Sequence, residues 1–378
     1  MRIVIAPDSF KGTATAHDVA LAIREGWCEV RPEDFVDLIP FADGGEGTLA
    51  ALAGAEPRAI FHDVTVHGPA DQDVHACWVE LPGKRGVVEL ANTSGIELLS
   101  DLRPGTAHTW GFGQAIADAL DHGMESLTLA IGSSCSTDAG TGMLRALGAD
   151  LFDASGDPLP LGGAALSELA CVHFDGLAPL PPGGVTVCCD VDAPLLGPRG
   201  AAAVFGPQKG IQTAEVERYE SALAHFASFL PSVDAEAAGT GAAGGTGYGL
   251  LAWGAALVPG AVAVAEALNA DERIREADLV ITGEGRYDGQ SDMGKAPALV
   301  RALADRHGKS SALIAGTIAS ETGRWEHALS LAELAGSVDS AMTHTSQWLR
   351  EAGRQLAVSI TRSRVSSATA LEVDGTQG

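Results

Sequence analysis

Positive charge is scarce in this sequence. Its 378 residues include 24 Lys and Arg against 49 Asp and Glu, which gives a formal net charge of −25. A chain this acidic repels nucleic acid and anionic membrane surfaces, and we expect neither as a partner. We interpret most of the acidity as a solvated surface, so an anionic substrate would need a locally positive pocket.

Lysine is scarcer still, because only five of the 24 basic residues are Lys. All five stand directly beside a glycine, and Lys11, Lys209 and Lys295 do so in loop-like sequence. Arg therefore supplies most of the surface cations, and a Lys kept in a glycine loop indicates a compact ammonium placed against phosphate or carboxylate. Chance placement would explain any one of the three, but it explains all three together poorly.

Cysteine and histidine show none of the spacings that hold metals or disulfide frameworks. The six Cys include no C-x-x-C pair, and the eleven His include no H-x-x-x-H pair. A zinc site therefore has no support, and the cysteines fit small buried residues in a reducing compartment. No apolar run approaches membrane-spanning length, and Met1 leads directly into an expected strand. We expect a cytoplasmic protein.

Strand–loop–helix units occur near both ends of the chain. Apolar segments at 3–6, 37–40 and 279–281 are each followed by a loop with glycine and charged residues, and then by a helical pattern. Such units build a parallel sheet, whose ligands bind beyond the carboxyl ends of the strands. The expected loop over 283–295 carries charges of both signs on a glycine frame. We predict that it forms half of a nucleotide site.

The middle of the chain has a different texture. Three segments between residues 59 and 91 are rich in Val, Ile, Phe and Trp and are separated by turn signals, with no helix between them. They predict an antiparallel meander. We therefore expect an inserted mixed α/β domain over 58–274 and a discontinuous α/β domain made of residues 1–57 plus 275–378. A sequential split into two domains is the simpler alternative.

Two glycine patterns resemble nucleotide motifs without matching them. Gly289-x4-Gly294-Lys295 has P-loop spacing, but Ala296 stands where the Mg²⁺-binding hydroxyl belongs, and the loop begins too far beyond its strand. Gly239-x-Gly241-x-x-Gly244 has the dinucleotide spacing, but an acidic and alanine-rich stretch precedes it instead of an apolar strand. We expect neither a P-loop nor a Rossmann cofactor site, and interpret the second pattern as a hinge or a close helix approach.

Acidic residues lie at four glycine-rich places. These are Asp43 with Glu46, Asp190 with Asp192, Glu284 with Asp288, and Asp8 near Lys11. Mg²⁺ is commonly held by one or two carboxylates plus phosphate oxygens, and a carboxylate beside an acceptor hydroxyl can take its proton. Each place by itself also fits a turn or a helix cap. Together with Lys11, Lys209 and Lys295, they favour phosphate chemistry with Mg²⁺.

Several segments, in order along the chain, resemble signatures of the bacterial type I glycerate kinase family. They are Ala6–Gly12, Ala42–Thr48, Cys189–Asp192, Pro194–Pro198, Val204–Gly210, Gly241–Gly245 and Ile281–Gly285, followed by Gln290-Ser291 and Gly294-Lys295. The resemblance spans nearly the whole chain. One loop departs from the pattern: Gly132–Gly140 keeps Ser134, Asp138 and Gly140, but two family glycines and an Asn are replaced, so we expect a stiffer loop.

The resemblance implies ATP-dependent phosphorylation of D-glycerate with Mg²⁺, usually to 2-phosphoglycerate and ADP. It also implies two different α/β domains with the active site in the cleft between them. One domain would hold a Rossmann- or flavodoxin-like parallel sheet assembled from both chain ends, and the inserted domain a mixed sheet.

On this basis we predict site residues of three kinds. The catalytic set is Lys11, Asp190, Asp192 and Lys295. The substrate- or nucleotide-binding set is Asp8, Ser9, Lys209, Gly283, Glu284, Arg286, Gln290, Ser291, Ser134 and Asp138, with the Arg286 guanidinium as a clamp for the substrate carboxylate. The metal set is Asp43, Glu46, Asp190 and Asp288.

Other functions stay open at this point. A kinase of another small hydroxy acid would share these features, and a nicotinamide-dependent dehydrogenase or a non-catalytic sensor of small acids would fit the composition. The pattern does not choose between the 2- and 3-hydroxyl, between the candidate bases, or between a monomer and a homodimer.

Overall fold

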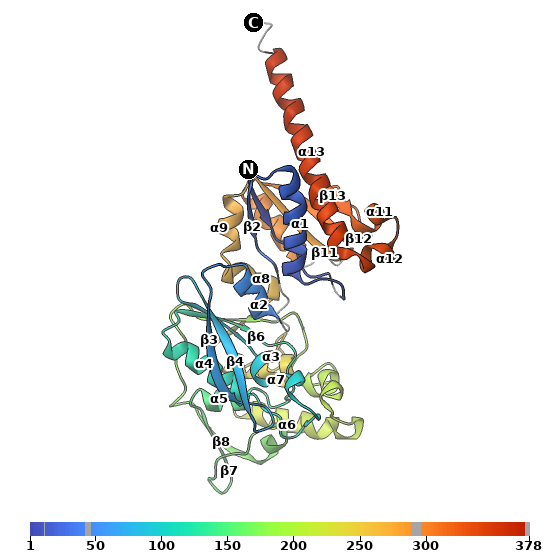
Figure 1. The fold of residues 1–378 in the computed structure, drawn as a ribbon. Coiled ribbons are helices and arrows are strands. Elements are labelled where there is room, and N and C mark those ends of the chain that lie inside the picture. The colour runs from blue at the N-terminus through green and yellow to red at the C-terminus, as the bar shows by residue number, and fades with distance from the viewer. Residues whose placement is uncertain (11, 42–46, 289–295, 375–378) are drawn as a thin grey trace. The chain divides into compact units, whose positions relative to one another are not determined.

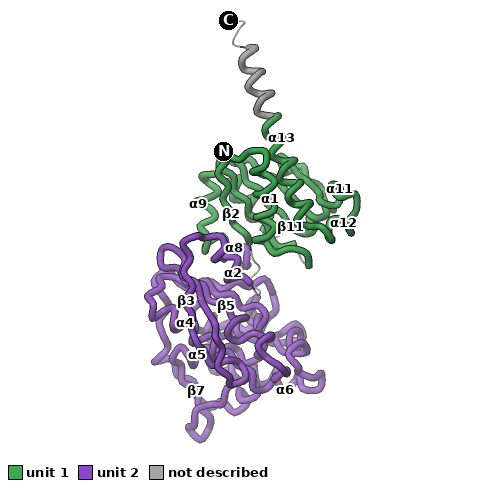
Figure 2. The backbone as a smooth tube through the Cα atoms, viewed as in Figure 1, with its two compact units in different colours: residues 1–42, 264–378 green, residues 43–263 purple. Residues whose placement is uncertain are grey.

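The computed structural model of the protein describes residues 1–10, 12–41, 47–288 and 296–374, with side chains up to residue 362. The chain forms two compact units, which Figure 2 colours separately: unit 1 is residues 1–42 with 264–378, and unit 2 is residues 43–263. The expected domain limits, after residues 57 and 274, stay a prediction. The units themselves divide after residues 42 and 263.

Unit 1 is an α/β unit built from both ends of the chain (Figure 1). Its strands are β1 (Arg2–Ile5), β2 (Phe35–Leu38), β11 (Leu279–Tyr287), β12 (Ser310–Ile318) and β13 (His327–Ser330). Its helices are α1 (Ala16–Val30), α9 (Ala270–Arg275), α10 (Ala296–Arg306), α11 (Leu331–Ala335), α12 (Val338–Thr343) and α13 (Thr345–Asp374), and α8 (Gly260–Ala267) spans the boundary between the units.

The strands of unit 1 form one parallel sheet in the order β13-β12-β11-β1-β2. Strand β1 joins the two chain ends, because Ile3 pairs with Leu279 on one side and with Val36 on the other. Consecutive residues Ile3, Val4 and Ile5 are all fully buried, as expected for a parallel strand covered on both faces. The prediction of a parallel sheet assembled from both termini is confirmed.

Helices α1 and α13 cover one face of this sheet. Trp27 of α1 and Leu356 of α13 share a core with Ile5, Ile281 and Ile314 of the strands. Helix α10 packs on β11 and β12 and contributes no side chain to that core.

Strand β11 is longer than the sequence indicated. The pattern predicted a loop from Gly283, but residues Gly283 to Tyr287 continue the strand and pair with β12 as far as Tyr287↔Ile318. Glycine makes this possible: a Cβ on Gly283 would lie 2.1 Å from the Ile314 carbonyl oxygen, and one on Gly316 would lie 2.3 Å from the Gly285 carbonyl oxygen. The glycines that suggested a loop are sites of close strand contact.

Unit 2 is a second α/β unit. Its strands are β3 (Ile60–His67), β4 (Asp73–Leu81), β5 (Arg85–Glu89), β6 (Ser126–Ala130), β7 (Asp150–Asp153), β8 (Leu169–His173), β9 (Val185–Cys188) and β10 (Ala256–Val258). Its α-helices are α2 (Thr48–Gly54), α3 (Ala91–Ser94), α4 (Trp110–Asp121), α5 (Thr141–Ala146), α6 (Val216–Ser228) and α7 (Ala242–Trp253).

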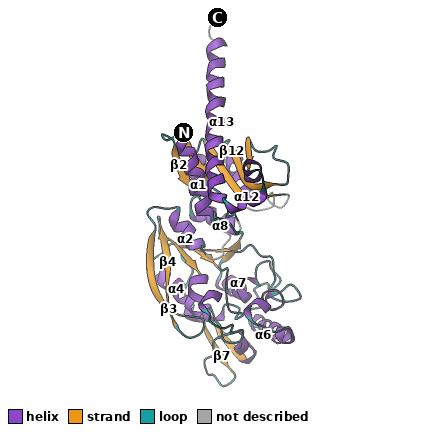
Figure 3. Ribbon diagram, turned by 45° about the vertical axis from the view of Figure 1, so that its right-hand side comes forward, coloured by secondary structure: helices purple, strands orange, loops and turns teal. Residues whose placement is uncertain are grey.

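The main sheet of unit 2 is mixed, with the order β10-β9-β6-β5-β4-β3. Figure 3 shows the strands in orange, with β3 and β4 labelled. Strands β10, β9, β6 and β5 run parallel, and β4 and β3 complete an antiparallel meander. Helices α4 and α5 pack together, and their side chains Phe112 and Met143 share a core with Trp78 of β4 and Leu129 of β6. The expected meander and mixed sheet are confirmed.

No helix among the described residues combines the length and apolar character that a membrane span requires. All six cysteines are free thiols.

Candidate active site

A pocket of about 280 Å³ opens in unit 2 where two neighbouring parallel strands end. Strand β6 leads into Ile131–Ser134, and strand β9 leads into Cys188–Val191. Carboxyl ends of adjacent parallel strands are where open α/β sheets bind ligands. The remaining lining residues are Phe205, Gln208, Lys209, Ala242 and Ala243. Three segments of the sequence signature therefore contribute to one pocket.

Lys209 is the cation of this pocket. It ends a 3₁₀ turn, Pro207–Lys209, that follows a π-helix, and it is only 2% exposed. Its Nζ donates to Ser134 Oγ and to the Ser136 carbonyl oxygen, both at 2.6 Å. Burial lowers the pKa of Lys209 to about 8, although the nearby Cys135 and Asp138 favour its charged form.

Asp138 organises the loop that carries these acceptors. Its buried carboxylate accepts hydrogen bonds from Thr109 N at 2.9 Å, Thr109 Oγ1 at 2.8 Å and Ser136 Oγ at 3.0 Å. The backbone N–H groups of Gly140 and Gly142 add two longer bonds, both at 3.3 Å. A carboxylate with this many donors fixes the loop conformation. Its predicted role in ligand binding stays a prediction.

Several residues in and near the pocket have a left-handed backbone conformation. Ser133, Ala139 and Ala243 have φ of 58°, 54° and 53°, which costs an L-residue about 1–2 kcal/mol each. Gly244 follows at φ 68°, and a Cβ there would lie 2.0 Å from the Ser136 carbonyl oxygen and 2.9 Å from Lys209 Nζ. Strained backbone of this kind is typical of functional sites.

The glycine pattern at 239–244 serves close packing. A Cβ on Gly241 would lie 2.1 Å from the Pro194 carbonyl oxygen, and Gly239 is left-handed at φ 85°. The residues before Gly239 form turns rather than a strand. The interpretation as a close approach is therefore confirmed at Gly241 and Gly244.

Asp190 is the carboxylate of the pocket. It follows β9, is exposed, and accepts a 2.8 Å hydrogen bond through Oδ1 from the backbone N–H of Gly260, the first residue of α8. Asp192 is also exposed, but it is not part of the pocket lining. Mg²⁺ prefers carboxylate oxygens that keep access to water and to phosphate. The exposed carboxylate of Asp190 fits that requirement.

The cysteines at the pocket are unsuited to nucleophilic chemistry. Burial raises the pKa of Cys135 to about 12, and its Sγ donates to the Ser94 carbonyl oxygen at 3.1 Å. Burial also raises the pKa of Cys189, and the nearby Asp190 and Asp192 act in the same direction. Both stay thiols at neutral pH, so they act as packing groups.

The sheet edge of unit 1 brings other predicted residues together. Asp8 follows β1, and its backbone N–H donates to the Gly283 carbonyl oxygen at 2.8 Å. The Ser9 backbone N–H donates to Asp8 Oδ1 at 2.6 Å, and Thr282 Oγ1 donates to the Ala6 carbonyl oxygen at 2.7 Å. These bonds tie the start of the Asp8 loop to β11 beyond the carboxyl end of β1.

Glu284 and Arg286 follow Gly283 in β11, and Asp288 comes directly after the strand. Glu284 is buried at 5% exposure, whereas the Arg286 side chain is 70% exposed. Arg286 Nε lies 3.4 Å from Asp288 Oδ2. That guanidinium would compete with a metal ion for this oxygen of Asp288.

Six predicted residues lie outside the described part of the chain: Lys11, Asp43, Glu46, Gln290, Ser291 and Lys295. The residues that follow Glu46 are held by a buried carboxylate of β5. Glu89 accepts hydrogen bonds from Gly47 N at 3.2 Å and from Leu49 N at 2.9 Å, at the start of α2.

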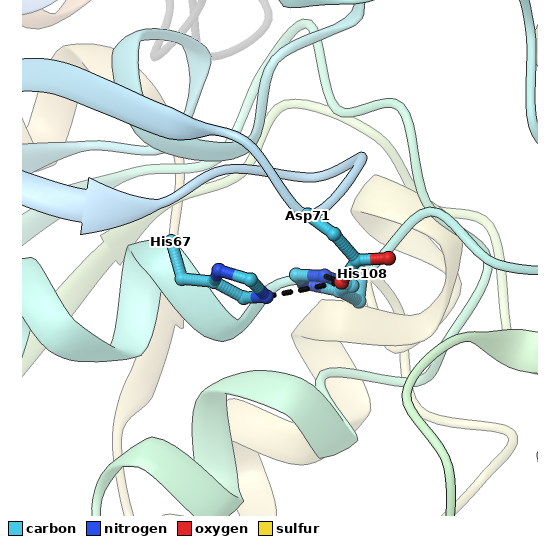
Figure 4. A group of neighbouring side chains, drawn as sticks. All are labelled: His67, Asp71 and His108. Carbon is cyan, nitrogen blue, oxygen red and sulfur yellow. Dashed lines mark hydrogen bonds and ion pairs between the residues drawn. The ribbon is translucent and has the colours of Figure 1, made fainter.

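Two histidines and an aspartate also meet in unit 2 (Figure 4). Asp71 Oδ1 lies 3.0 Å from His67 Nε2 and 3.4 Å from His108 Nε2, and all three ligand atoms fall within 4.8 Å of one another. Sequence spacing gave no sign of this cluster, because His108 is distant along the chain. Its geometry would allow a metal ion.

Hydrogen bonding points to a different role for this cluster. The Trp110 backbone N–H donates to His108 Nδ1 at 3.3 Å, which places the proton of a neutral ring on Nε2, facing Asp71. Metal-bound histidines instead donate the proton of their other nitrogen. The cluster therefore fits a hydrogen-bonded latch between the β3–β4 turn and the start of α4. Burial tends to raise the pKa of Asp71, but bonds from both histidines outweigh it and lower that pKa.

Sequence reasoning missed several contributors to the pocket. Ser136 contributes a backbone carbonyl, which no residue-type pattern reveals. Phe205 and Gln208 lie in the segment Val204–Gly210, which resembles the family signature. Their position close to Lys209 in the sequence could have indicated that they line the pocket. The position of Ala243 depends on the left-handed turn inside α7, which the sequence pattern did not indicate.

A sequence model of the glycerate kinase family matches residues 3–361. The chain is 40% identical over 373 residues to a glycerate kinase of Halalkalibacterium halodurans, covering 94% of this chain and 97% of that protein. It is 40% identical over 332 residues to the glycerate 2-kinase of Escherichia coli, covering 85% of this chain and 87% of that protein.

A solved structure shares the whole fold. It is a crystal structure of a candidate glycerate kinase 2 from Salmonella typhimurium LT2, with a TM-score of 0.83 and 37% sequence identity. The alignment covers 96% of this chain and 99% of that chain.

Proposed function

The chain belongs to the glycerate kinase family, whose members are ATP-dependent kinases, and we propose that it transfers the γ-phosphoryl group of ATP to the 2-hydroxyl of D-glycerate. The products are then 2-phosphoglycerate and ADP. One observation carries this proposal: a carboxylate, Asp190, and a buried ammonium, Lys209, line the same small pocket. Phosphorylating a hydroxy acid calls for a proton acceptor near the hydroxyl and a cation for the anionic groups.

The size of the pocket favours the acid over the nucleotide. Its volume of about 280 Å³ lies just below the range of roughly 300–1,000 Å³ that is usual for drug-sized ligands. A pocket of this size suits an acid of seven heavy atoms better than a nucleoside triphosphate. We therefore assign the acceptor to unit 2. The nucleotide phosphates are assigned to the predicted residues of unit 1.

The chemical step exchanges one P–O bond for another. The glycerate hydroxyl oxygen attacks the γ-phosphorus, the bond to the β–γ bridging oxygen breaks, and the hydroxyl proton passes to Asp190 or Asp192. Lys11 and Lys295 neutralise the transferring phosphoryl group, and Ser9 and Ser291 hydrogen-bond to it. Asp190 lines the pocket and Asp192 does not, so we favour Asp190 as the base.

Mg²⁺, when bound, neutralises phosphate charge. Asp190 would hold it together with Asp43, Glu46 and Asp288, the other members of the predicted metal set. Substitution separates the two roles of Asp190. If it holds the metal, Asp190→Asn raises the Mg²⁺ concentration needed for half-maximal rate. If it is the base, kcat falls while that concentration stays unchanged, and Asp192→Asn tests the other candidate base in the same way.

A coupled assay tests the activity and its product together. The protein is incubated with ATP, Mg²⁺ and D-glycerate, and enolase is added with and without phosphoglycerate mutase. We expect enolase alone to consume the product, because it accepts the 2-phosphate. A requirement for mutase would assign the 3-hydroxyl instead. Absence of glycerate-dependent ADP would refute the kinase proposal, and a panel of other small hydroxy acids would then identify a different acceptor.

The compartment and the assembly are further parts of this proposal. Six free cysteines support the cytoplasm as the compartment. A monomer or a homodimer is expected, and light scattering during size-exclusion chromatography measures which one forms.

A further inference from the structure

Lys209 is an incompletely compensated charge in the absence of substrate. Within the described part of the chain it forms no ion pair, and its two hydrogen-bond acceptors, Ser134 Oγ and the Ser136 carbonyl oxygen, are both neutral. Burying an ammonium costs several kcal/mol unless charge and hydrogen bonds compensate it. An ammonium has three N–H donors, so one remains for a ligand. Because Lys209 lines the pocket, an anion bound there supplies the missing partner.

Ser134 adds a second donor at the same place. Its Oγ accepts from Lys209, and its own O–H is donated to no described residue. Ser134 also lines the pocket. A hydroxyl can accept and donate at once, so the contact to Lys209 leaves the O–H proton available. The two groups, 2.6 Å apart, therefore present one N–H and one O–H side by side.

We propose that Lys209 and Ser134 form a two-donor clamp for the carboxylate of the substrate, and that this clamp makes the enzyme select acids over the corresponding neutral alcohols. The inference rests on the proposed function and specifies how its acceptor is recognised. A single ammonium matches a singly charged carboxylate, and the neutral Ser134 hydroxyl satisfies the second oxygen. A triphosphate carries several charges and needs more cations than this pocket holds.

The surroundings keep the clamp rigid. Gly244 passes so close that any side chain there would contact Lys209 Nζ, and Asp138 holds the Ser136 hydroxyl. Two donors whose positions are fixed before binding lose little entropy when the carboxylate arrives. Arg286, the clamp expected from sequence, is largely exposed and lies against Asp288, and its role stays a prediction.

Steady-state kinetics separate the two clamps. KM for D-glycerate and KM for ATP are measured in the wild type and in the variants Lys209→Met, Ser134→Ala, Arg286→Met and the surface control Lys84→Met. Loss of a charge-assisted hydrogen bond predicts that Lys209→Met raises KM for D-glycerate about tenfold to a hundredfold and leaves KM for ATP within about twofold. Ser134→Ala raises KM for D-glycerate about twofold to tenfold, and Lys84→Met changes neither constant.

Two further readouts separate binding from a structural role. Ser134→Thr keeps the hydroxyl and restores KM for D-glycerate toward the wild-type value, and it serves even if Lys209→Met fails to fold. The ratio of kcat/KM for D-glycerate to kcat/KM for glycerol falls in Lys209→Met, because this variant lacks the ammonium that binds the carboxylate.

Each outcome bears on one claim. An active wild type whose KM for D-glycerate is unchanged in Lys209→Met, or is raised by Arg286→Met instead, would overturn the clamp and leave the kinase intact. A raised KM for ATP alone in Lys209→Met or Ser134→Ala would also overturn it. A wild type without glycerate-dependent ADP formation refutes the proposed function itself.

Discussion

The buried charge of Lys209 predicts a pH dependence of stability that its removal should abolish. Its pKa in the folded protein is about 8, because burial disfavours the ammonium, against 10.5 for an ordinary lysine. Below pH 8 both the folded and the unfolded chain hold the proton, and the folded chain bears the full cost of burial. At about 1.4 kcal/mol for each pH unit, the interval from 8 to 10.5 makes that cost about 3 kcal/mol.

The sign follows from proton binding. Between pH 8 and 10.5 the unfolded chain binds more protons than the folded chain at this site, so the free energy of unfolding rises with pH. Urea unfolding of the wild type and of Lys209→Met is measured at several values from pH 7.5 to 9.5. Subtracting the free energy of unfolding of the variant from that of the wild type cancels the contributions of the other titrating groups. This difference in free energy should rise by about 2 kcal/mol over this range.

The exposed Lys84 supplies the control. Its Nζ pairs with Glu80 at the surface and its side chain is 52% exposed, so Lys84→Met should leave the difference nearly flat over the same pH range. If the difference for Lys209→Met is equally flat, or falls as pH rises, the ammonium is not destabilised by burial and the reasoning fails.

Three further predictions concern the frame of the site. Asp138→Ala should lower the free energy of unfolding by about 3 kcal/mol or more, because several buried donors lose a charged acceptor, whereas the exposed Asp175→Ala should change it by less than about 0.5 kcal/mol. Gly244→Ala should abolish D-glycerate turnover. Its control is Gly184→Ala, at a glycine that is also left-handed (φ 79°) but has open space around it. That change should lower the free energy of unfolding by only about 1–2 kcal/mol. The lowered pKa of Asp71 contributes stability that is present above the ordinary carboxyl range and is lost as pH falls through the lowered value. Asp71→Asn should therefore flatten the acid limb of a stability profile, and an unchanged limb would contradict the latch.

Sequence patterns predicted the parts of the fold that depend on short apolar segments. Ile3–Ile5 and Leu279–Ile281 are buried on both faces, so their periodicity and β-branched composition indicated parallel strands directly. Their pairing across the chain ends followed from the alternation of strand and helix at both termini. The length of β11 did not, because glycine favours loops in isolation and is tolerated in a strand where another backbone approaches closely.

The sequence indicated which residue types form the candidate site, but it did not indicate which of them form hydrogen bonds with each other. Lys209 and Ser134 stood in separate recognised segments, and nothing in their spacing indicated that one donates to the other. The acceptor at Ser136 is a backbone carbonyl, and its position depends on the left-handed turns at Ser133 and Gly244. Tertiary contacts of this kind are set by loop conformation, which composition does not encode.

The most direct measurement of the central claim is the ³¹P NMR spectrum of a reaction containing the purified protein, ATP, Mg²⁺ and D-glycerate. We expect the γ-phosphate signal of ATP to be replaced by the signal of one phosphate monoester, split by the single proton on C2, with an equal amount of ADP. Unchanged ATP, or inorganic phosphate with glycerate intact, would contradict this expectation.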